Sequence, residues 1–347
     1  VILYFSCVIV YGWTGSSAYV DLLREFSEID AFPGEFRIAK DPYGLIDLED
    51  SLVHNWDFIR HDVAIRDFIE YCEVLSRDTG LFKKAGKNLT RKLDIDFMSL
   101  TKDFIDNLTD MSYVGDTSVH RYKISALKYF YMRLRTKYSN YSHNNSTKMY
   151  LSRPSEERFI LASKKYISNL FSAYARQNNI DTIVLDQAIP STNIVKASAY
   201  FENMKVIVVD RDPRDIYANL SKRNSLFGAD INKNDSSERY VKWHLKLREL
   251  SANDSINNAK VPTLRVNFEE LIYDYKSTVD KVSNFIGKGK HHKYQYKNFN
   301  PKSEYAKKNV GMWKEYKNQK VMEEILKELP EYCYHGDTNF SESKVKS

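Results

Sequence analysis

The sequence feature that most restricts the fold is an apolar segment followed directly by a small-residue loop. Residues 1–12 are VILYFSCVIVYG, and the loop continues through residues 13–17 (WTGSS) before apolar residues return at helical spacing over 18–26. A bilayer span needs about 20 apolar residues, and the cleavage-site pattern of a signal peptide is missing. We therefore predict a buried strand, a turn and a helix, and we expect no transmembrane segment and a cytoplasmic location.

A second feature is the alternation of short apolar segments with helical patterns in the second half of the chain. Residues 182–185 (TIVL), 205–209 (KVIVV) and 262–266 (PTLRV) are typical of strands buried on both faces of a parallel sheet. Helical patterns separate and follow them at 215–223, 237–252, 269–286 and 319–329. This alternation predicts an α/β fold with a central parallel sheet and helices on both faces.

Between these regions the pattern is mainly helical. Residues 35–39 (EFRIA), after a Pro-Gly pair, alternate polar and apolar as a short strand would. Apolar residues then recur every three or four positions over 60–75, 97–108, 124–138 and 156–175. We predict a single domain over residues 1–347 with a largely helical insertion at about 55–178.

Charge and cysteine content exclude several classes of protein. With 52 Lys and Arg against 46 Asp and Glu, the net charge of +6 suits a phosphorylated ligand but is too small for a dedicated nucleic-acid binder. Cys7, Cys72 and Cys333 have no spacing typical of a disulfide framework or a zinc site. The His291-His292 pair lacks further ligands at metal spacing. We expect no nucleic-acid partner and no bound metal.

The loop from Gly12 to Ser17 is the first candidate site. Backbone N–H groups at a helix N-terminus, reached through small residues, can bind an anion without any particular side chain. The Walker pattern G-x-x-x-x-G-K-[ST] is absent, because Gly15 is followed by Ser16, Ser17 and Ala18. The loop suits a phosphate-like group and argues against a Mg-ATP enzyme. An ordinary turn capped by Ser or Thr is the alternative.

Arg211 is the second candidate. It follows the strand predicted at 205–209, and open α/β sheets bind ligands at the carboxyl ends of their strands. The planar donor fork of arginine suits phosphate. Asp212 and Pro213 are explained by the start of a helix, but helix capping does not explain Arg211.

These two segments resemble those of the sulfotransferases that use 3'-phosphoadenosine 5'-phosphosulfate (PAPS). The resemblance implies a P-loop-like nucleotide site, whose loop would cradle the 5'-phosphosulfate. Here that loop comprises Trp13, Thr14, Gly15, Ser16 and Ser17. Arg211 would hold the 3'-phosphate together with residue 219, where Asn219 replaces the family's serine. The implied cofactor is PAPS, its product is adenosine 3',5'-bisphosphate, and no metal is required.

A third match lies near the C-terminus. Residues 307–314 (KKNVGMWK) resemble the basic loop and the Gly-x-Trp-Lys motif that close over the nucleotide in this family. The match implies that Lys307 and Lys308 bind the cofactor. A solvated lysine-rich surface is the alternative, because residues 287–320 contain ten lysines against two glutamates. The three matches occur in the family's order.

Two cations common in the family are missing. Trp13 stands where many members have Lys or Arg, and Gln187 corresponds to another common lysine. Loss of one oriented donor to developing charge typically lowers the rate about 100-fold or more. Either Arg37 or Lys40 replaces a missing cation, or the donor or the activity differs from the family norm.

A catalytic base is expected at the strand predicted over 35–39. The resemblance implies a His or a carboxylate that takes the proton of the acceptor hydroxyl, and Glu35 fits that place, with Asp41 second. Glu35 and Arg37 share one face if this segment is a strand, while Lys40 would turn in from its end. The alternative for Glu35 is an exposed charge after a Pro-Gly turn.

Together these features predict a sulfotransferase that transfers a sulfuryl group from PAPS to a hydroxyl of a small molecule or glycan, and the resemblance favours a carbohydrate. A nucleotide-dependent phosphoryl transferase on the same core is a second hypothesis. A third is a catalytically silent nucleotide- or glycan-binding protein that has lost the two cations.

Overall fold

A five-stranded parallel sheet is the central element of the computed structural model, which describes residues 3–78, 86–115, 117, 119, 124–138, 147–252, 261–287 and 295–335. The chain forms two compact units. The first comprises Val1–Arg37 and Asn178–Ser347, and the second comprises Ile38–Gln177. The segment predicted as a helical insertion, at about 55–178, makes up most of the second unit.

All five strands of the sheet belong to the first unit, in the order β2-β5-β1-β6-β7. They are β1 (Tyr4–Val10), β2 (Ile29–Glu35), β5 (Thr182–Asp186), β6 (Met204–Asp210) and β7 (Thr263–Asn267). The predicted α/β class is confirmed, and the apolar N-terminal segment forms the middle strand. Phe5, Val8 and Ile9 of this strand are fully buried, as expected for a strand covered on both faces.

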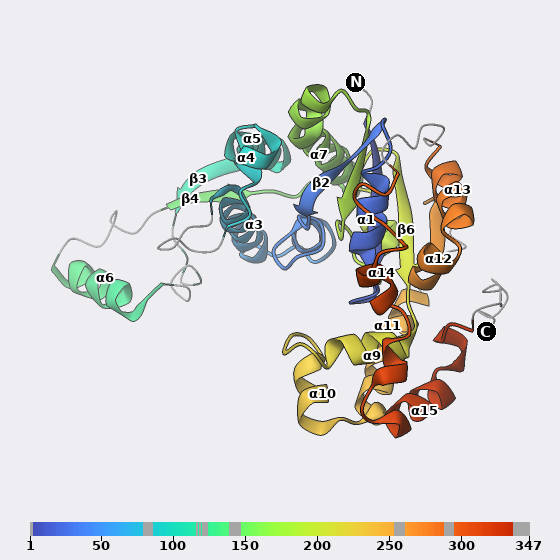
Figure 1. Ribbon diagram of the computed structural model, residues 1–347. Helices are drawn as coiled ribbons and strands as arrows, with labels where there is room; N and C mark the ends of the chain where they lie inside the picture. The colour runs from blue at the N-terminus through green and yellow to red at the C-terminus, as the bar shows by residue number, and fades with distance from the viewer. Residues whose placement is uncertain are drawn as a thin grey trace. The chain divides into compact units, whose positions relative to one another are not determined.

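The first unit has helices of very different length. They are α1 (Ser16–Leu23), α8 (Ile194–Ser198), α9 (Pro213–Leu220), α10 (Gly228–Asn234), α11 (Ser237–Ala252), α12 (Phe268–Tyr273), α13 (Tyr275–Ile286), α14 (Glu304–Lys308) and α15 (Gln319–Glu328), with 3₁₀ turns η3 (Met312–Glu315) and η4 (Pro330–Tyr332). α1, α12 and α13 share a buried apolar cluster with the sheet. Figure 1 shows these three helices next to the strands. A second cluster joins α9, α10, α11 and α15.

The second unit is mainly helical and contains a small two-stranded antiparallel sheet. Its elements are α2 (Leu45–Glu49), the π-helical turn η1 (Asp50–His54), α3 (Arg60–Ser76), α4 (Leu89–Leu93), α5 (Phe97–Leu108), β3 (Met111–Gly115), α6 (Ala126–Tyr138), β4 (Thr147–Leu151) and α7 (Glu156–Asn178). Buried rings of Phe104 and Tyr166 stack at 4.6 Å between centroids, linking α5 to α7. No helix among the described residues is long and apolar enough to cross a bilayer.

The strand predicted at 35–39 is wrong in its position. β2 runs from Ile29 to Glu35, through the Pro33-Gly34 pair that was expected to precede the strand. Its pairing with β5 is regular up to Ala31 and resumes at Glu35, with an irregularity between them. Proline is tolerated here because β2 is an edge strand, where one row of N–H groups has no ladder partner.

Two further differences concern the helical pattern. The single helix expected over 269–286 is two helices, α12 and α13, with Asp274 between them at φ −129° and ψ 55°. The antiparallel β3–β4 pair was not predicted; it pairs Met111 with Leu151 and Gly115 with Thr147.

Candidate functional site

The loop between β1 and α1 is shaped by left-handed residues. Backbone φ is 104° at Gly12, 57° at Trp13 and 95° at Gly15. A Cβ added to Gly15 would lie 2.5 Å from Cδ2 of Phe268, so both the conformation and the close approach require glycine. α1 starts at Ser16 without a side-chain cap. The first N–H groups of a helix have no partner within the helix, and donors of this kind bind anions.

Side chains fasten this loop to neighbouring strands. The buried Thr14 hydroxyl donates to the carbonyl oxygen of Val209 at 2.6 Å, which ties the loop to β6. The Gln187 amide, directly after β5, lies 3.5 Å from Oγ of Ser16. Ser17 is exposed. The Thr14 hydroxyl therefore holds the loop in place. Gln187, where many family members have a lysine, puts a neutral amide beside the loop.

Arg211 follows the end of β6 and connects the three predicted segments. Its Nη1 donates to the carbonyl oxygen of Trp13 at 3.2 Å, and its Nη2 donates to the carbonyl oxygen of Asn309. Its guanidinium carbon lies 4.9 Å from the centre of the Phe268 ring. The structure thus brings the N-terminal loop, the β6–α9 segment and the C-terminal loop together at one side chain.

The environment of Arg211 is almost closed to solvent. Only 3% of the residue is exposed, and its Nε has no hydrogen-bond partner among the described residues. Burial lowers the pKa of Arg211, while the carboxylates of Asp215 and Glu269 act in the opposite direction. A buried guanidinium with an unused donor suits an anionic ligand, since a charge-assisted bond offsets its desolvation.

The start of α9 follows the capping pattern predicted from the sequence. Asp212 accepts from the backbone N–H of Arg214 at 2.8 Å, and Pro213 occupies the first helical position. The guanidinium of Arg214 also binds Asp212, at 3.0 Å and 2.6 Å, and lies 4.0 Å over the ring of Trp313. These contacts fix the backbone that follows Arg211.

Two carboxylates that the sequence analysis did not identify hold this region together. Asp215 accepts from the backbone N–H groups of Gly311 at 2.8 Å and Trp313 at 3.0 Å, so α9 binds the C-terminal loop. Glu269 accepts from the backbone N–H of Asp212 at 2.9 Å, and burial raises the pKa of Glu269 to about 8. Each carboxylate accepts from a distant backbone donor, which leaves no motif in the sequence.

Three of the remaining predicted cofactor residues lie on helices. Asn219 is half-buried on α9, eight residues after Arg211. Lys307 and Lys308 form the exposed last turn of α14, and Lys308 pairs with Glu304 at 3.6 Å. Trp13 carries the guanidinium of Arg223 over its ring at 4.3 Å. Arg223 is therefore a cation next to Trp13, and no sequence motif indicated it.

The structure brings two of the three predicted catalytic residues together. Glu35 ends β2, and its Oε2 accepts from Nη1 of Arg37 at 3.3 Å. Both side chains are partly exposed, at 43% and 37%. Glu35 pairs in register with Asp186, the last residue of β5, so it lies at the same carboxyl edge of the sheet as the β1–α1 loop. Lys40 belongs to the second unit.

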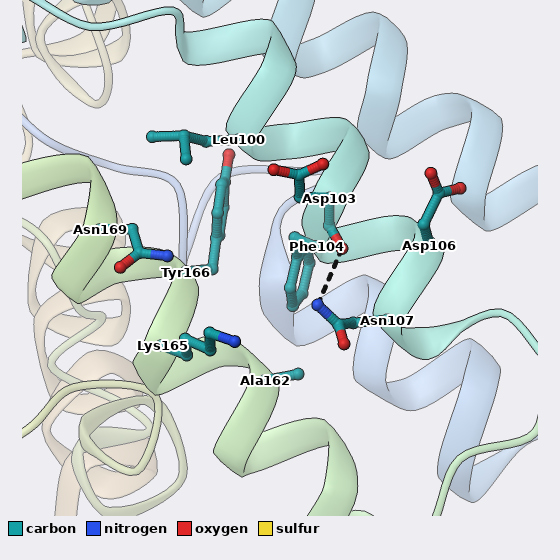
Figure 2. A pocket seen from close by; sticks show the side chains of 9 residues that line it. All are labelled: Leu100, Asp103, Phe104, Asp106, Asn107, Ala162, Lys165, Tyr166 and Asn169. Atoms are coloured by element: carbon teal, nitrogen blue, oxygen red, sulfur yellow. Dashed lines mark hydrogen bonds between the residues drawn. The ribbon is translucent and has the colours of Figure 1, made fainter.

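A separate pocket of about 480 Å³ lies between α5 and α7 in the second unit. Figure 2 shows its lining side chains, which are Leu100, Asp103, Phe104, Asp106, Asn107, Ala162, Lys165, Tyr166 and Asn169. The amide of Asn107 donates to the backbone oxygen of Asp103 at 3.1 Å. The pocket contains none of the predicted site residues. Across the described parts of the chain, no group of three or more His, Cys, Asp and Glu side chains could hold a metal ion.

Two comparisons, with solved structures and with family models, found similar proteins. The chain is similar to the sulfotransferase domain of the olefin synthase of Synechococcus PCC 7002, with 10% identity, 93% of this chain and 92% of that chain covered, and a TM-score of 0.41. It is also similar to sulfotransferase STF9 from Mycobacterium avium, with 11% identity, 83% and 64% covered, and a TM-score of 0.34. No curated protein matches. A model of the sulfotransferase family matches residues 90–289, more than half of the sequence, and the chain therefore belongs to the sulfotransferase family.

Proposed function

We propose that this member of the sulfotransferase family uses PAPS as its donor and transfers the sulfuryl group to a hydroxyl of a small molecule or glycan, with a carbohydrate favoured by the family resemblance. The observation that carries the proposal is the junction at Arg211. There the loop after β1 and the loop before η3 are hydrogen-bonded to one buried guanidinium.

The residues at this junction fit a nucleotide with two anionic ends. The helix N-terminus after Gly15 offers backbone donors, and Gly15 supplies the positive φ and the close approach to Phe268 that shape the loop before it. The buried Nε of Arg211 is a donor without a partner in the described part of the chain. Asn219 and the Lys307-Lys308 pair complete the proposed phosphate-binding set. PAPS, when bound, supplies the sulfuryl group, and no metal is needed.

The chain's own contribution to the reaction is positioning and proton transfer. Glu35 takes the proton of the acceptor hydroxyl while the oxygen of that hydroxyl forms the new bond to sulfur. The bond from sulfur to the bridging oxygen of the donor breaks, and its electrons leave with that oxygen. Arg37 positions the Glu35 carboxylate through their 3.3 Å contact and supplies positive charge at this edge. Proton transfer of this kind contributes about 10²- to 10⁴-fold in rate.

The decisive experiment combines a binding titration with a transfer assay. The intact protein is titrated with adenosine 3',5'-bisphosphate and then assayed with labelled PAPS and a panel of hydroxyl acceptors that includes oligosaccharides. We expect binding and transfer. Failure of both measurements would refute the proposal, and transfer of phosphate from labelled ATP instead would establish the phosphoryl-transferase hypothesis.

A Glu35→Gln variant separates the base from the binding site. Turnover should fall by at least about 100-fold while bisphosphate affinity stays nearly unchanged. Glu28→Gln is the matched control, because Glu28 is an exposed glutamate just before β2, at the opposite end of that strand. Near-normal turnover in Glu35→Gln would eliminate this role for Glu35 and move attention to Asp41, Asp186 or a histidine.

One observation favours a catalytically silent binding protein as a second candidate. Both family cation positions are neutral here, and the structure places Gln187 beside Ser16. Tight bisphosphate binding with no transfer to any acceptor would favour this candidate. An active enzyme would refute this candidate, and a strong fall of its turnover in Arg37→Ala would show that Arg37 contributes to the reaction, as a replacement cation or through the Glu35 carboxylate.

A further inference from the structure

Helix α6 in the second unit exposes an apolar stripe. Leu127, Phe130, Tyr131 and Leu134 are spaced i, i+3, i+4 and i+7, which places them on one side of a helix. They are 83%, 62%, 63% and 41% exposed. In a helix of a folded domain, such a stripe normally packs against a core. Here solvent reaches all four side chains.

The side of α6 opposite this stripe carries the least exposed of its described side chains. Every residue from Ala126 to Leu134 is exposed except Met132, which is half-buried. At about 100° per residue, Met132 lies roughly opposite the centre of the stripe. The apolar stripe is therefore on the more exposed side of the helix.

The charges around the stripe have one sign. Lys128 and Arg133 are exposed and, by helical geometry, lie about 60° outside the two edges of the stripe. The sequence from 117 to 150 contains no Asp or Glu. It contains seven Lys and Arg: Arg121, Lys123, Lys128, Arg133, Arg135, Lys137 and Lys148. The whole chain, by contrast, is nearly balanced, with 52 basic and 46 acidic residues.

We propose that α6 binds the surface of a membrane that contains anionic lipids, lying in the plane of the interface. A helix with Phe, Tyr and Leu on one side and only basic charge beside it is complementary to such a surface, because the apolar side enters the headgroup region while the cations bind lipid phosphates. A second copy of the chain fits less well, since two such helices would bring like charges together. The proposal is independent of the reaction catalysed by the first unit.

The test is co-sedimentation of the full chain with vesicles of phosphatidylcholine alone and of phosphatidylcholine mixed with phosphatidylserine. We expect binding to the mixed vesicles that weakens as salt is raised, and little binding to the neutral ones. Each basic residue near an anionic surface strengthens binding about fivefold, so the double variant Lys128→Glu with Arg133→Glu should lose at least about 20-fold. Phe130→Ser with Tyr131→Ser should also lose binding at least about tenfold.

Two matched controls change equally exposed residues elsewhere. Leu161→Ser with Leu226→Ser removes two apolar side chains that are 66% and 68% exposed. Lys92→Glu with Lys327→Glu makes the same change in net charge at two exposed lysines. Both should bind vesicles like the parent protein. Equal binding to neutral and mixed vesicles, or unchanged binding in the Phe130 and Tyr131 variant, would overturn the proposal. So would an oligomer in lipid-free solution that the α6 variants dissociate, together with no vesicle binding.

Discussion

β1 and β6 lie side by side, with Val10 paired with Val209, and the loop after β1 and the segment after β6 both lead into a helix. The first is shaped mainly by backbone conformation, with three left-handed residues and no side-chain cap on α1, and the uncharged Thr14 hydroxyl ties it to β6. The second is held by charged side chains, with Asp212 capping α9 and a buried arginine between carboxylates. Adjacent strands thus build one candidate site by two means, and the two means should fail under different changes.

The largest effect is expected at Gly15. Gly15→Ala forces a left-handed alanine, which costs about 1–2 kcal/mol, and sets its Cβ against Phe268, where overpacking costs about 1–3 kcal/mol more. Urea unfolding should show a loss of about 2–5 kcal/mol. Gly287→Ala is the control, because Gly287 also has positive φ but, among the described residues, a Cβ there meets only Lys205 Nζ, at 3.8 Å. Equal losses in the two variants would show that contact with Phe268 does not matter.

Arg211→Ala should weaken adenosine 3',5'-bisphosphate binding by about 10- to 100-fold, as expected for the loss of a charge-assisted contact of about 1.5–3 kcal/mol. Isothermal titration measures this. Arg24→Ala is the control, since Arg24 is a partly exposed arginine paired with Asp21 on the surface. Unchanged affinity in a folded Arg211→Ala protein would remove Arg211 from the site.

Glu269 makes the β6 side of the comparison sensitive to pH. Its folded pKa of about 8 lies above the ordinary value of 4.5, so the folded state binds this proton more tightly than the unfolded state, and stability falls as pH rises from about 4.5 to 8. Between pH 6.5 and 8 the unfolding free energy should fall by up to about 2 kcal/mol. Burial lowers the pKa of His244 to about 3, so His244 affects stability only below this pH window. Glu269→Gln should flatten the profile, and a parallel profile would contradict the assignment.

The smallest effect is expected at Asp215. Asp215→Asn leaves one carbonyl oxygen to accept from both Gly311 and Trp313 N–H groups, and should loosen the C-terminal loop by about 1 kcal/mol. Hydrogen exchange at these two amides should become faster. Asp230→Asn on α10 should leave them unchanged, because Asp230 pairs with Arg239 instead.

The regular elements could be predicted because each carries its own pattern. The helices expected at 97–108 and 237–252 have those bounds in the structure, and the strands at 182–185 and 205–209 are one or two residues longer. β2 was misplaced because Pro33-Gly34 usually marks a turn, whereas an edge strand tolerates it. The antiparallel β3–β4 pair was not predicted because its strands are far apart in sequence and no short turn joins them.

Within the candidate site, the sequence indicated only those residues whose type is unusual at their place in the chain. Gly15 after a strand and Arg211 between a strand and a helix are of that kind. Asp215 and Glu269 are not, because an acidic residue in the first turn of a helix is ordinary, and their partners are backbone groups remote in sequence. The junction of the three motifs at Arg211 is a contact between distant segments, which no local pattern encodes.

The edge position of β2 has a consequence for local unfolding. In the sheet, β2 pairs with β5 on one side only. An edge strand of this kind can separate without breaking the other strand pairs of the sheet. Glu35, the proposed base, is the last residue of this strand. Partial unfolding that releases this edge strand would remove catalysis while leaving the nucleotide junction at Arg211 intact.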